Sequence, residues 1–368
     1  MEKTINKHLL AYLNFSSEEL YQFFPPVFRN YNKQVIAQKM FEKEIKNNKE
    51  LIFSKWSIVK HPESCEVKKL EIEMREDTFP YEATEENETA WYPNFADKRL
   101  FGYYSGSLLA QDELQVLEHP ILGSLRDCLT KVSDSVDHCE PLTRSGQTPT
   151  PILIMNAERR CHFHVEPNVK EGRPFGLYGN TFARTFTNIV IKALELLNPP
   201  TFSNIYAMEA PKYGRGDYTF NQIYDLFSQC YTGYTAAKIL SSVPKLKKKS
   251  QIRFNDQNDF NFLDKEETIE LNPIEQTVTI HLGHWGCGAY GGSRIMATII
   301  QLLAGCLTGV DKMVYHTFNK IGSKEYNIGF QILQELIEKH EKDGKIAIME
   351  ILSDIEELKI QWGHSDGN

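Results

Sequence analysis

A strand, a glycine-rich loop and a helix are predicted in succession between Thr277 and Phe318. Apolar residues alternate with polar ones from Val278 to Leu282, which is the pattern of a half-buried strand. The ten residues from Gly283 to Gly292 follow, and five of them are glycine. From Ile295 to Cys306 the apolar residues recur at helical spacing. A strand that passes through bare backbone into a helix places several N–H groups around one point.

This loop predicts a site for a phosphate or a diphosphate, because unpaired amides and the positive end of a helix both attract an anion. The alternative is a tight structural turn, since glycine also permits left-handed backbone and close packing. The number of glycines favours the anion site. A Walker A loop is excluded, because no Lys-Ser or Lys-Thr pair follows the glycines.

The loop also fits the GxGxxG fingerprint of dinucleotide-binding folds, through Gly286, Gly288 and Gly291. Alone this is a weak signal, because the fingerprint should open the first βαβ unit and be followed by an acidic residue after the second strand. Here the unit lies near the C-terminal end, and Asp311 precedes the next strand, which is predicted from Lys312 to Phe318. A dinucleotide oxidoreductase is therefore disfavoured and stays an alternative.

The composition is that of a soluble globular protein with a substantial core, since 41% of the 368 residues are hydrophobic and 24% are charged. The net charge of −8 argues against broad nucleic-acid binding, which needs a basic surface. The N-terminal residues lack the apolar run of a signal peptide, and the longest apolar stretch, 295–307, is too short to span a membrane. We expect a cytoplasmic protein, or one that enters a host cytosol without a cleavable signal peptide, as a bacterial effector would.

The seven cysteines include no C-x-x-C pair and are predicted to be reduced, scattered thiols. Cys161, His162 and His164 form the one cluster with metal-ligand chemistry. A structural zinc site needs a second cluster at suitable spacing, so we expect no metal.

Two kinds of pattern divide the chain. Residues 1–60 are predicted to be helical: Ser16 and Glu19 form a capping box, and a second helix is expected from Arg29 to Lys46. From Glu66 on, strands and helices alternate, which predicts an α/β domain with a parallel or mixed sheet. We expect strands at 67–74, 152–155 and 204–208, helices at 111–129, 186–197 and 221–240, one or two helices within 326–360, and surface connections at 130–150 and in the lysine-rich run 245–249.

Two blocks of this sequence resemble the poly(ADP-ribose) glycohydrolase family of macrodomains. The segment Trp285–Gly292 is similar to that family's Trp-Gly-Cys-Gly-x-Phe-Gly-Gly loop, and the segment 315–318, Tyr-His-Thr-Phe, is similar to its Tyr-Phe-Thr-Phe strand. Upstream, Asn94–Lys98 and Gln111–Glu113 resemble the family's Asp-Phe-Ala-Asn-Lys and Gln-Glu-Glu motifs at the same separation. The resemblance extends over about residues 80–320.

The resemblance implies a three-layer macrodomain-like α/β fold, with a mixed central sheet flanked by helices. On this basis we divide the chain into an N-terminal helical accessory region (1–60), a macrodomain (61–330) and a C-terminal helical extension packed on the same domain (331–368). It implies no cofactor. The partners it implies are an ADP-ribosylated protein as substrate and ADP-ribose as product.

The resemblance also implies the site. Glu113 takes the place of the catalytic glutamate and Asp112 that of its acidic neighbour, with Gln111 beside them. Cleavage at the ribose C1″ needs an acid for the leaving group and a base for water, and one carboxylate can serve as both in turn. Adjacent helical residues point about 100° apart, so we expect Glu113 to face the scissile bond and Asp112 or Gln111 to orient the ribose or a loop. Acids that stabilise the helix dipole are the alternative.

The ligand-binding residues implied by the resemblance fall into three groups. The glycine loop would hold the diphosphate, with Tyr290 against the ribose. Phe318 would stack on adenine, and Glu82 would bind the adenine edge. The full set is Glu82, Asp97, Gly102, Tyr103, Asn180, Gly286, Cys287, Gly288, Ala289, Tyr290, Gly291, Gly292 and Phe318.

The chain departs from the family where a triple glycine is replaced by Phe101-Gly102-Tyr103 and an asparagine by Asp97. Phe and Tyr cannot copy the close backbone approach that glycine allows. We therefore expect an ADP-ribosyl hydrolase that acts on mono-ADP-ribosylated protein, with the aromatic loop 101–104 as a surface that contacts the protein. A non-catalytic ADP-ribose reader and a poly(ADP-ribose) glycohydrolase are the alternatives.

Overall fold

The computed structural model of the chain describes residues 1–42, 49–67, 70–243, 250–254, 260–264, 274–365 and 367. The predicted helix end at Lys46 and the lysine-rich run 245–249 lie outside the described residues. In the part that is described, no helix is both long and apolar enough to cross a membrane.

The centre of the fold is a mixed β-sheet that contains ten strands among the described residues, in the order β11-β10-β1-β2-β8-β9-β5-β12-β13-β4. The half from β9 to β4 is parallel, whereas β1, β2, β8 and β9 pair antiparallel. The strands are β1 (Leu9–Ser16), β2 (Glu50–Trp56), β4 (Glu71–Arg75), β5 (Glu88–Phe95), β8 (Ile152–Phe163), β9 (Leu194–Met208), β10 (Ser250–Phe254), β11 (Phe260–Asp264), β12 (Thr277–Leu282) and β13 (Lys312–His316). Two small pairs stand apart, β3 (Ser64–Glu66) with β14 (Lys345–Ala347) and β6 (Arg144–Ser145) with β7 (Thr148–Pro149).

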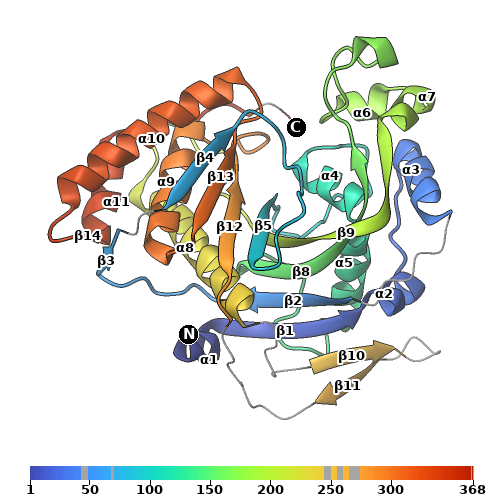
Figure 1. The fold of residues 1–368 in the computed structure, drawn as a ribbon, viewed down its shortest axis with the longest axis horizontal. Helices are drawn as coiled ribbons and strands as arrows, with labels where there is room; N and C mark the ends of the chain where they lie inside the picture. Colours follow the sequence, from blue (N-terminus) through green and yellow to red (C-terminus); the bar gives the residue numbers. More distant parts are fainter. Residues whose placement is uncertain are drawn as a thin grey trace.

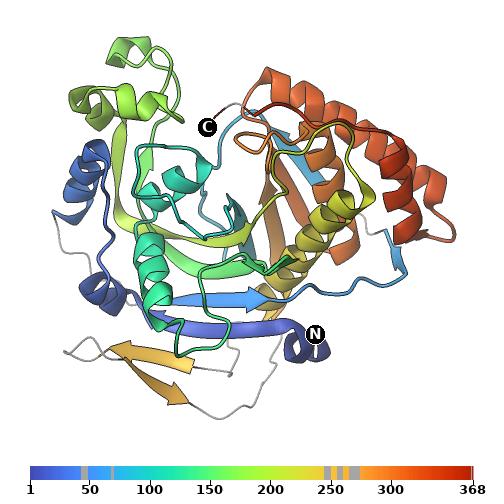
Figure 2. The same ribbon diagram turned by 180° about the vertical axis from the view of Figure 1, so that it is seen from behind.

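Helices cover both faces of this sheet, and the alternation of side chains along β9 shows why. Ile205 and Ala207 are buried in one hydrophobic core, whereas Tyr206 and Met208 are buried in the other. The α-helices are α1 (Glu2–His8), α2 (Ser17–Phe23), α3 (Tyr31–Phe41), α4 (Gln111–Glu118), α5 (Ile121–Val132), α6 (Thr181–Arg184), α7 (Thr187–Val190), α8 (Phe220–Ser242), α9 (Arg294–Thr308), α10 (Lys320–His340) and α11 (Ile348–Glu357). Figure 1 shows α8 to α11 gathered around β12, β13 and β4, and α2 to α7 around the other end of the sheet; Figure 2 shows the same division from behind.

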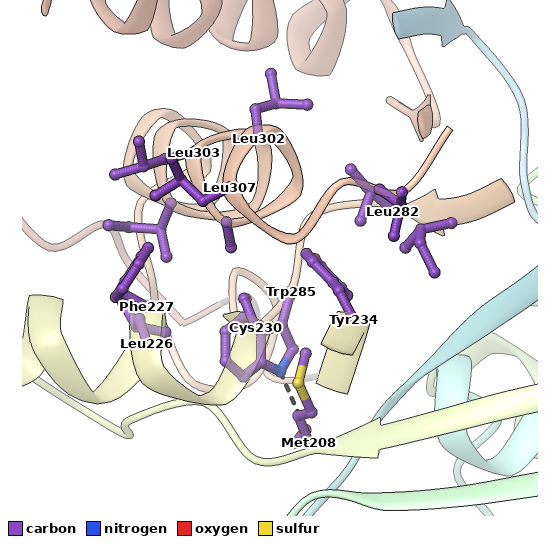
Figure 3. Packing of buried hydrophobic residues seen from close by; sticks show 14 of the residues in the cluster. Met208, Leu226, Phe227, Cys230, Tyr234, Leu282, Trp285, Leu302, Leu303 and Leu307 are labelled. Carbon is purple, nitrogen blue, oxygen red and sulfur yellow. Dashed lines mark hydrogen bonds between the residues drawn. The ribbon is translucent and has the colours of Figure 1, made fainter. Parts of the chain in front are cut away.

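The core beside the parallel strands lies between α8 and α9. Leu303 and Leu307 of α9 face Leu226 and Phe227 of α8 (Figure 3). Trp285, in the loop after β12, is buried beneath them, and its Nε1 donates to the Met208 carbonyl oxygen at 3.1 Å. The glycine-rich loop is therefore anchored to the core by the Trp285 side chain.

The α/β architecture with a mixed central sheet is confirmed, as is the sequence's most informative segment. The predicted strand from Val278 to Leu282 is β12, the helix that follows is α9, and the next strand is β13. The helix predicted at 221–240 is α8, and the pattern within 326–360 corresponds to α10 and α11. Ser16 caps α2 as predicted, since its Oγ accepts from the backbone N–H of Glu19 at 3.3 Å.

The prediction that residues 1–60 are helical is wrong in part, because β1 and β2 are strands of the central sheet. Residues 11–15 are buried on both faces of β1, so the segment is apolar without a clear alternation. A continuous apolar run of this length does not distinguish a buried strand from a helix. Pairing with β2 and β10 decides the matter.

Two other helix predictions need correction. The segment 111–129 forms two helices, α4 and α5, because Pro120 lacks the N–H that would continue the first. The segment 186–197 contains α7 and a 3-10 turn at Ile191–Ala193, but from Leu194 it is strand β9, whose first residues pair with the end of β8. The expected strand at 67–74 is confirmed only as β4, with β3 ending just before it.

Candidate functional site

A cavity of about 1000 Å³ lies at the carboxyl ends of the parallel strands. Phe95 ends β5, Gly283 follows β12, His316 ends β13, Ala210 follows β9 and Asp77 follows β4, and all five line it. In open α/β sheets this edge is where ligands bind, because the loops after the strands converge there. The glycine-rich loop and the start of α4 form two of its walls.

The glycine-rich loop presents free amides to the cavity. Gly286 to Tyr290 line it, and among the described residues the N–H groups of Gly288, Ala289 and Tyr290 have no acceptor. The neighbouring amides are already used within the loop: Gly291 donates to the Gly288 oxygen at 3.0 Å and Gly292 to the Gly286 oxygen at 2.8 Å. Three successive free donors are suited to an anion.

Two glycines of the predicted ligand-binding set have a structural role and do not line the cavity. Gly291 and Gly292 do not line the cavity. Gly291 has φ +72° and packs against the segment 363–365, so that a Cβ there would lie 3.0 Å from the Ser365 nitrogen. A Cβ on Gly292 would lie 2.8 Å from the Gly286 carbonyl oxygen. These glycines shape the loop and bring its amides into place.

The acids predicted from the sequence lie together in the wall opposite the loop. Asp112 and Glu113 both line the cavity and are 8% and 4% exposed. Glu113 Oε2 accepts from the Ala110 N–H at 3.1 Å, and Asp112 Oδ1 accepts from Asn94 Nδ2 at 2.8 Å. Gln111 binds the end of β5 through its amide, donating to the Pro93 oxygen at 2.9 Å and accepting from the Phe95 N–H at 2.8 Å. Gln111 thus positions α4.

Burial governs the charge state of this pair. Burial raises the pKa of Glu113, and the positive charge of Lys33 acts against that rise. Burial also raises the pKa of Asp112, and the neighbouring Glu113 carboxylate raises it further, while the hydrogen bond from Asn94 acts against the rise. A carboxyl group with a raised pKa can hold a proton near neutral pH, which a general acid must do.

The loop before α4 differs from the prediction. Phe101 has φ +52° and its side chain is fully buried in the hydrophobic core, and Tyr104 is buried against Phe28 and Asp127. Only Gly102 and Tyr103 line the cavity, and Tyr103 is 51% exposed. An aromatic surface over residues 101–104 is therefore not formed, because two of its three rings pack inward.

Asp97 lies between the two walls. Its carboxylate accepts from the Tyr290 hydroxyl at 3.0 Å and forms an ion pair with Lys212. Lys212 also pairs with Glu209 Oε1 at 2.9 Å and lies over the Tyr290 ring. Burial is the largest single effect on Asp97 and opposes its ionisation, but the hydrogen bonds from Lys212, the Arg99 N–H and Tyr290 together with the Lys212 charge outweigh it, so the pKa of Asp97 is lowered. The aspartate is thus held as an anion by a lysine.

Several aromatic residues that were not predicted also line the cavity, in addition to the predicted Phe318. Phe318 is 51% exposed, and its ring centroid lies 5.9 Å from that of Tyr178. Phe79 packs edge-on against His316 with centroids 5.0 Å apart. Tyr81, Tyr213 and Phe318 all line the cavity with φ between +50° and +64°. Bulky side chains rarely adopt this backbone, and such residues cluster at functional sites.

Asp77, an acidic residue that the sequence analysis did not identify, also lines the cavity. Asp77 Oδ1 lies 2.6 Å from His316 Nδ1, and His316 Nε2 lies 2.9 Å from His281 Nδ1. Tyr92 stacks on His281 with centroids 4.0 Å apart. The Asp77 side chain is 45% exposed and lines the cavity. No local motif marks it, because Asp77 reaches the site through the pairing of β4 with β13.

Two predicted ligand-binding residues lie away from the cavity lining. The Glu82 carboxylate pairs with Arg75 Nη1 at 2.9 Å and is 57% exposed. Asn180 Nδ2 donates to the Gly367 oxygen at 3.1 Å.

The side chains of the predicted cluster Cys161, His162 and His164 do not all lie on the same side of β8. Cys161 is fully buried against Leu117, whereas His162 faces Glu118 and the cavity, because successive residues of β8 point to opposite faces. The part of the chain that the structure describes holds no group of three or more His, Cys, Asp or Glu residues that could bind a metal ion.

Comparison with known proteins gives one family match. Residues 179–325 match the model of poly(ADP-ribose) glycohydrolase, macro domain fold. Among solved structures, the chain is similar to the poly(ADP-ribose) glycohydrolase of Thermomonospora curvata bound to the inhibitor ADP-HPD, with 13% identity, 86% of this chain and 88% of that chain covered, and a TM-score of 0.39. It is also similar to the poly(ADP-ribose) glycohydrolase of Deinococcus radiodurans in complex with ADP-ribose, with 12% identity, 88% and 94% covered, and a TM-score of 0.39. A search of curated proteins found no match.

Proposed function

We propose that this chain, whose residues 179–325 match the model of poly(ADP-ribose) glycohydrolase, macro domain fold, is a hydrolase that removes ADP-ribose from modified protein side chains. One observation carries the proposal: a single cavity joins the free amides of Gly288–Tyr290 to the buried carboxylates of Asp112 and Glu113. The family match begins at residue 179, so the acids upstream of it rest on the resemblance of Gln111–Glu113 and on their geometry.

The arrangement supports one orientation of ADP-ribose. The diphosphate would accept from the free amides of the glycine-rich loop, which positions the nucleotide without a metal ion. Adenine would lie against Phe318, and the distal ribose would then extend toward the N-terminus of α4. Fixed placement of the sugar beside a carboxyl group supplies a large part of the rate enhancement in such a reaction.

In this orientation Glu113 would protonate the leaving oxygen or nitrogen at C1″ and then, as a carboxylate, take a proton from the attacking water. Its raised pKa favours the first role, and the charge of Lys33 favours the second. Asp112, held by Asn94, would bind a ribose hydroxyl. Tyr103, exposed at the cavity wall where the family has glycine, would narrow the space available to a further ADP-ribose unit. This supports a mono-ADP-ribosylated protein as the favoured substrate.

The test is a release assay on proteins that carry radiolabelled ADP-ribose on arginine, glutamate or serine, with poly(ADP-ribose) run in parallel. We expect the label to leave at least one of the mono-ADP-ribosylated proteins as free ADP-ribose, faster than it leaves the polymer. Faster release from the polymer would identify a poly(ADP-ribose) glycohydrolase. Binding of every substrate with release from none would contradict an enzyme.

One observation favours a reader as the second candidate. Glu113 Oε2 already accepts from the Ala110 N–H, so the carboxylate caps its own helix. A glutamate that serves only as a cap would leave a protein that binds ADP-ribose and does not cleave it. The same release assay, combined with calorimetry on ADP-ribose, separates the two candidates.

At the adenine end, we predict that Asp77, and not Glu82, binds the amino group of the base. Asp77→Ala should weaken ADP-ribose binding about tenfold, because one charge-assisted hydrogen bond is worth roughly 1.5–3 kcal/mol. Glu82→Gln is the matched control, since its carboxylate pairs with Arg75 outside the cavity lining. Calorimetry with ADP-ribose measures both variants. If Asp77→Ala binds ADP-ribose as tightly as the wild type, another residue binds the amino group of the base.

A further inference from the structure

Lys33 is a buried lysine in a part of the chain that the family match does not cover. It lies on α3, and its side chain is fully buried. Its Nζ donates to the Tyr104 carbonyl oxygen at 2.8 Å and to the Leu108 carbonyl oxygen at 2.7 Å. A buried ammonium is costly unless its donors are used, so these two bonds fix the loop as much as they fix the lysine.

The segment before α3 and the loop from Tyr104 to Leu108 are joined at a third point. The backbone N–H groups of Arg29 and Asn30 both donate to the Ser105 carbonyl oxygen, at 2.9 and 3.1 Å. Together with Lys33 this binds the carbonyl groups of residues 104, 105 and 108 to one short segment. Ser105 and Leu108 line the cavity, and α4 begins shortly after them at Gln111.

The positive charge of Lys33 also acts on both acids of the site, Asp112 and Glu113. Burial lowers the pKa of Lys33 to about 8, and the charges of Glu113 and Asp112 act in the opposite direction. Two charged groups act on it, Glu113 and Asp112 at the start of α4, and Asp97 in turn acts on Asp112. The lysine thus adds a positive charge that acts on both of these acids.

We propose that Lys33 is a positioning residue for the hydrolase: its ammonium holds the loop from Tyr104 to Leu108 in place and favours the carboxylate form of Glu113 after the leaving group has been protonated. The inference rests on the proposed function. It gives the N-terminal region an indirect part in catalysis, since α3 supplies a lysine that both holds the loop and acts on Glu113.

Lys33→Met tests it, with Lys33→Arg as the conservative variant and Lys55→Met as the matched control. Lys55 is also a buried lysine, 2% exposed, whose Nζ binds the carbonyl and carboxylate of Glu140 away from the cavity. We expect Lys33→Met to lower kcat by roughly 10–100-fold, within the range of a weakened acid–base step, with less effect on KM. Lys33→Arg should recover part of the rate, and Lys55→Met should retain the rate despite lower stability.

The pH dependence separates a positioning role from a merely structural one. Without the ammonium the pKa of Glu113 rises further, so the limb of the pH–rate profile that requires protonated Glu113, which is the loss of activity as pH rises, should move to higher pH in Lys33→Met and return in Lys33→Arg. An unmoved limb and an unchanged rate overturn the inference.

The release assay on the wild-type protein tests the proposed function separately. If it releases no ADP-ribose, that function fails. Lys33 is then judged by carbon-13 NMR titration of Glu113, where an unchanged pKa in Lys33→Met overturns the inference. Lys33→Gln, which removes the charge and keeps a polar amide, serves both readouts if Lys33→Met does not fold.

Discussion

Glu113→Gln is expected to abolish ADP-ribose release and to leave ADP-ribose binding intact. Glutamine keeps the size of the side chain and an oxygen that can accept from the Ala110 N–H, as Glu113 Oε2 does at 3.1 Å. It cannot donate a proton to the leaving group or accept one from water. General acid–base catalysis by one group contributes about 10²–10⁴-fold, so we expect a loss of that size in the release rate. The release assay measures the rate, and calorimetry measures affinity.

Asp112→Asn is the comparator for this variant. Asp112 is equally buried and adjacent, but its carboxylate is held by Asn94. We expect a smaller loss of rate and a measurable loss of affinity, because a ribose contact and not proton transfer is affected. If Asp112→Asn loses more activity than Glu113→Gln, the roles of the two acids are exchanged. If Glu113→Gln keeps the wild-type rate, the acid–base mechanism is wrong.

Gly286→Ala is expected to remove most of the affinity for ADP-ribose. Gly286 has φ +74°, a backbone conformation that costs a residue with a Cβ roughly 1–2 kcal/mol. A Cβ there would also lie 2.4 Å from the Cβ of Ala210, closer than any real contact allows. The loop must move to relieve both, and the amides of Gly288, Ala289 and Tyr290 move with it. We expect affinity to fall at least about tenfold, which corresponds to about 1.4 kcal/mol.

Gly216→Ala separates the two causes. Gly216 has φ +69°, and a Cβ placed there would meet no atom within 4 Å. This variant therefore carries the backbone strain without the clash and lies outside the cavity lining. Calorimetry should show its affinity unchanged, and thermal unfolding should show a small loss of stability. A Gly286→Ala variant that binds like the wild type would place the diphosphate elsewhere.

The segment from Thr277 to Phe318 was predictable because its information is local. Alternation gives β12, the dense glycines give the loop, and helical spacing gives α9, each within a few neighbouring residues. The same holds for Gln111–Glu113, whose place at the start of a helix follows from its own sequence. Both blocks line one cavity, as the resemblance implied.

The failures share a different cause. Residues 11–15 are buried on both faces, so the pattern of β1 does not reveal its partner strands. Phe101 looked like a surface residue of an aromatic loop, yet the core accepts its ring in a left-handed backbone conformation. The sequence alone assigned no role to Lys33. Its burial depends on carbonyl groups some seventy residues away, at Tyr104 and Leu108.

The sequence by itself determined which backbone could bind an anion and which carboxylates stood near a helix N-terminus, because glycine content and helical spacing act over short distances. Only the tertiary structure decided that Asp77 lines the cavity whereas Glu82 does not, that Gly291 and Gly292 pack within the protein instead of lining the cavity, and that the charge of Lys33 acts on Glu113. The physical reason is that burial and electrostatic proximity depend on which strands pair, and those contacts join residues far apart in the chain.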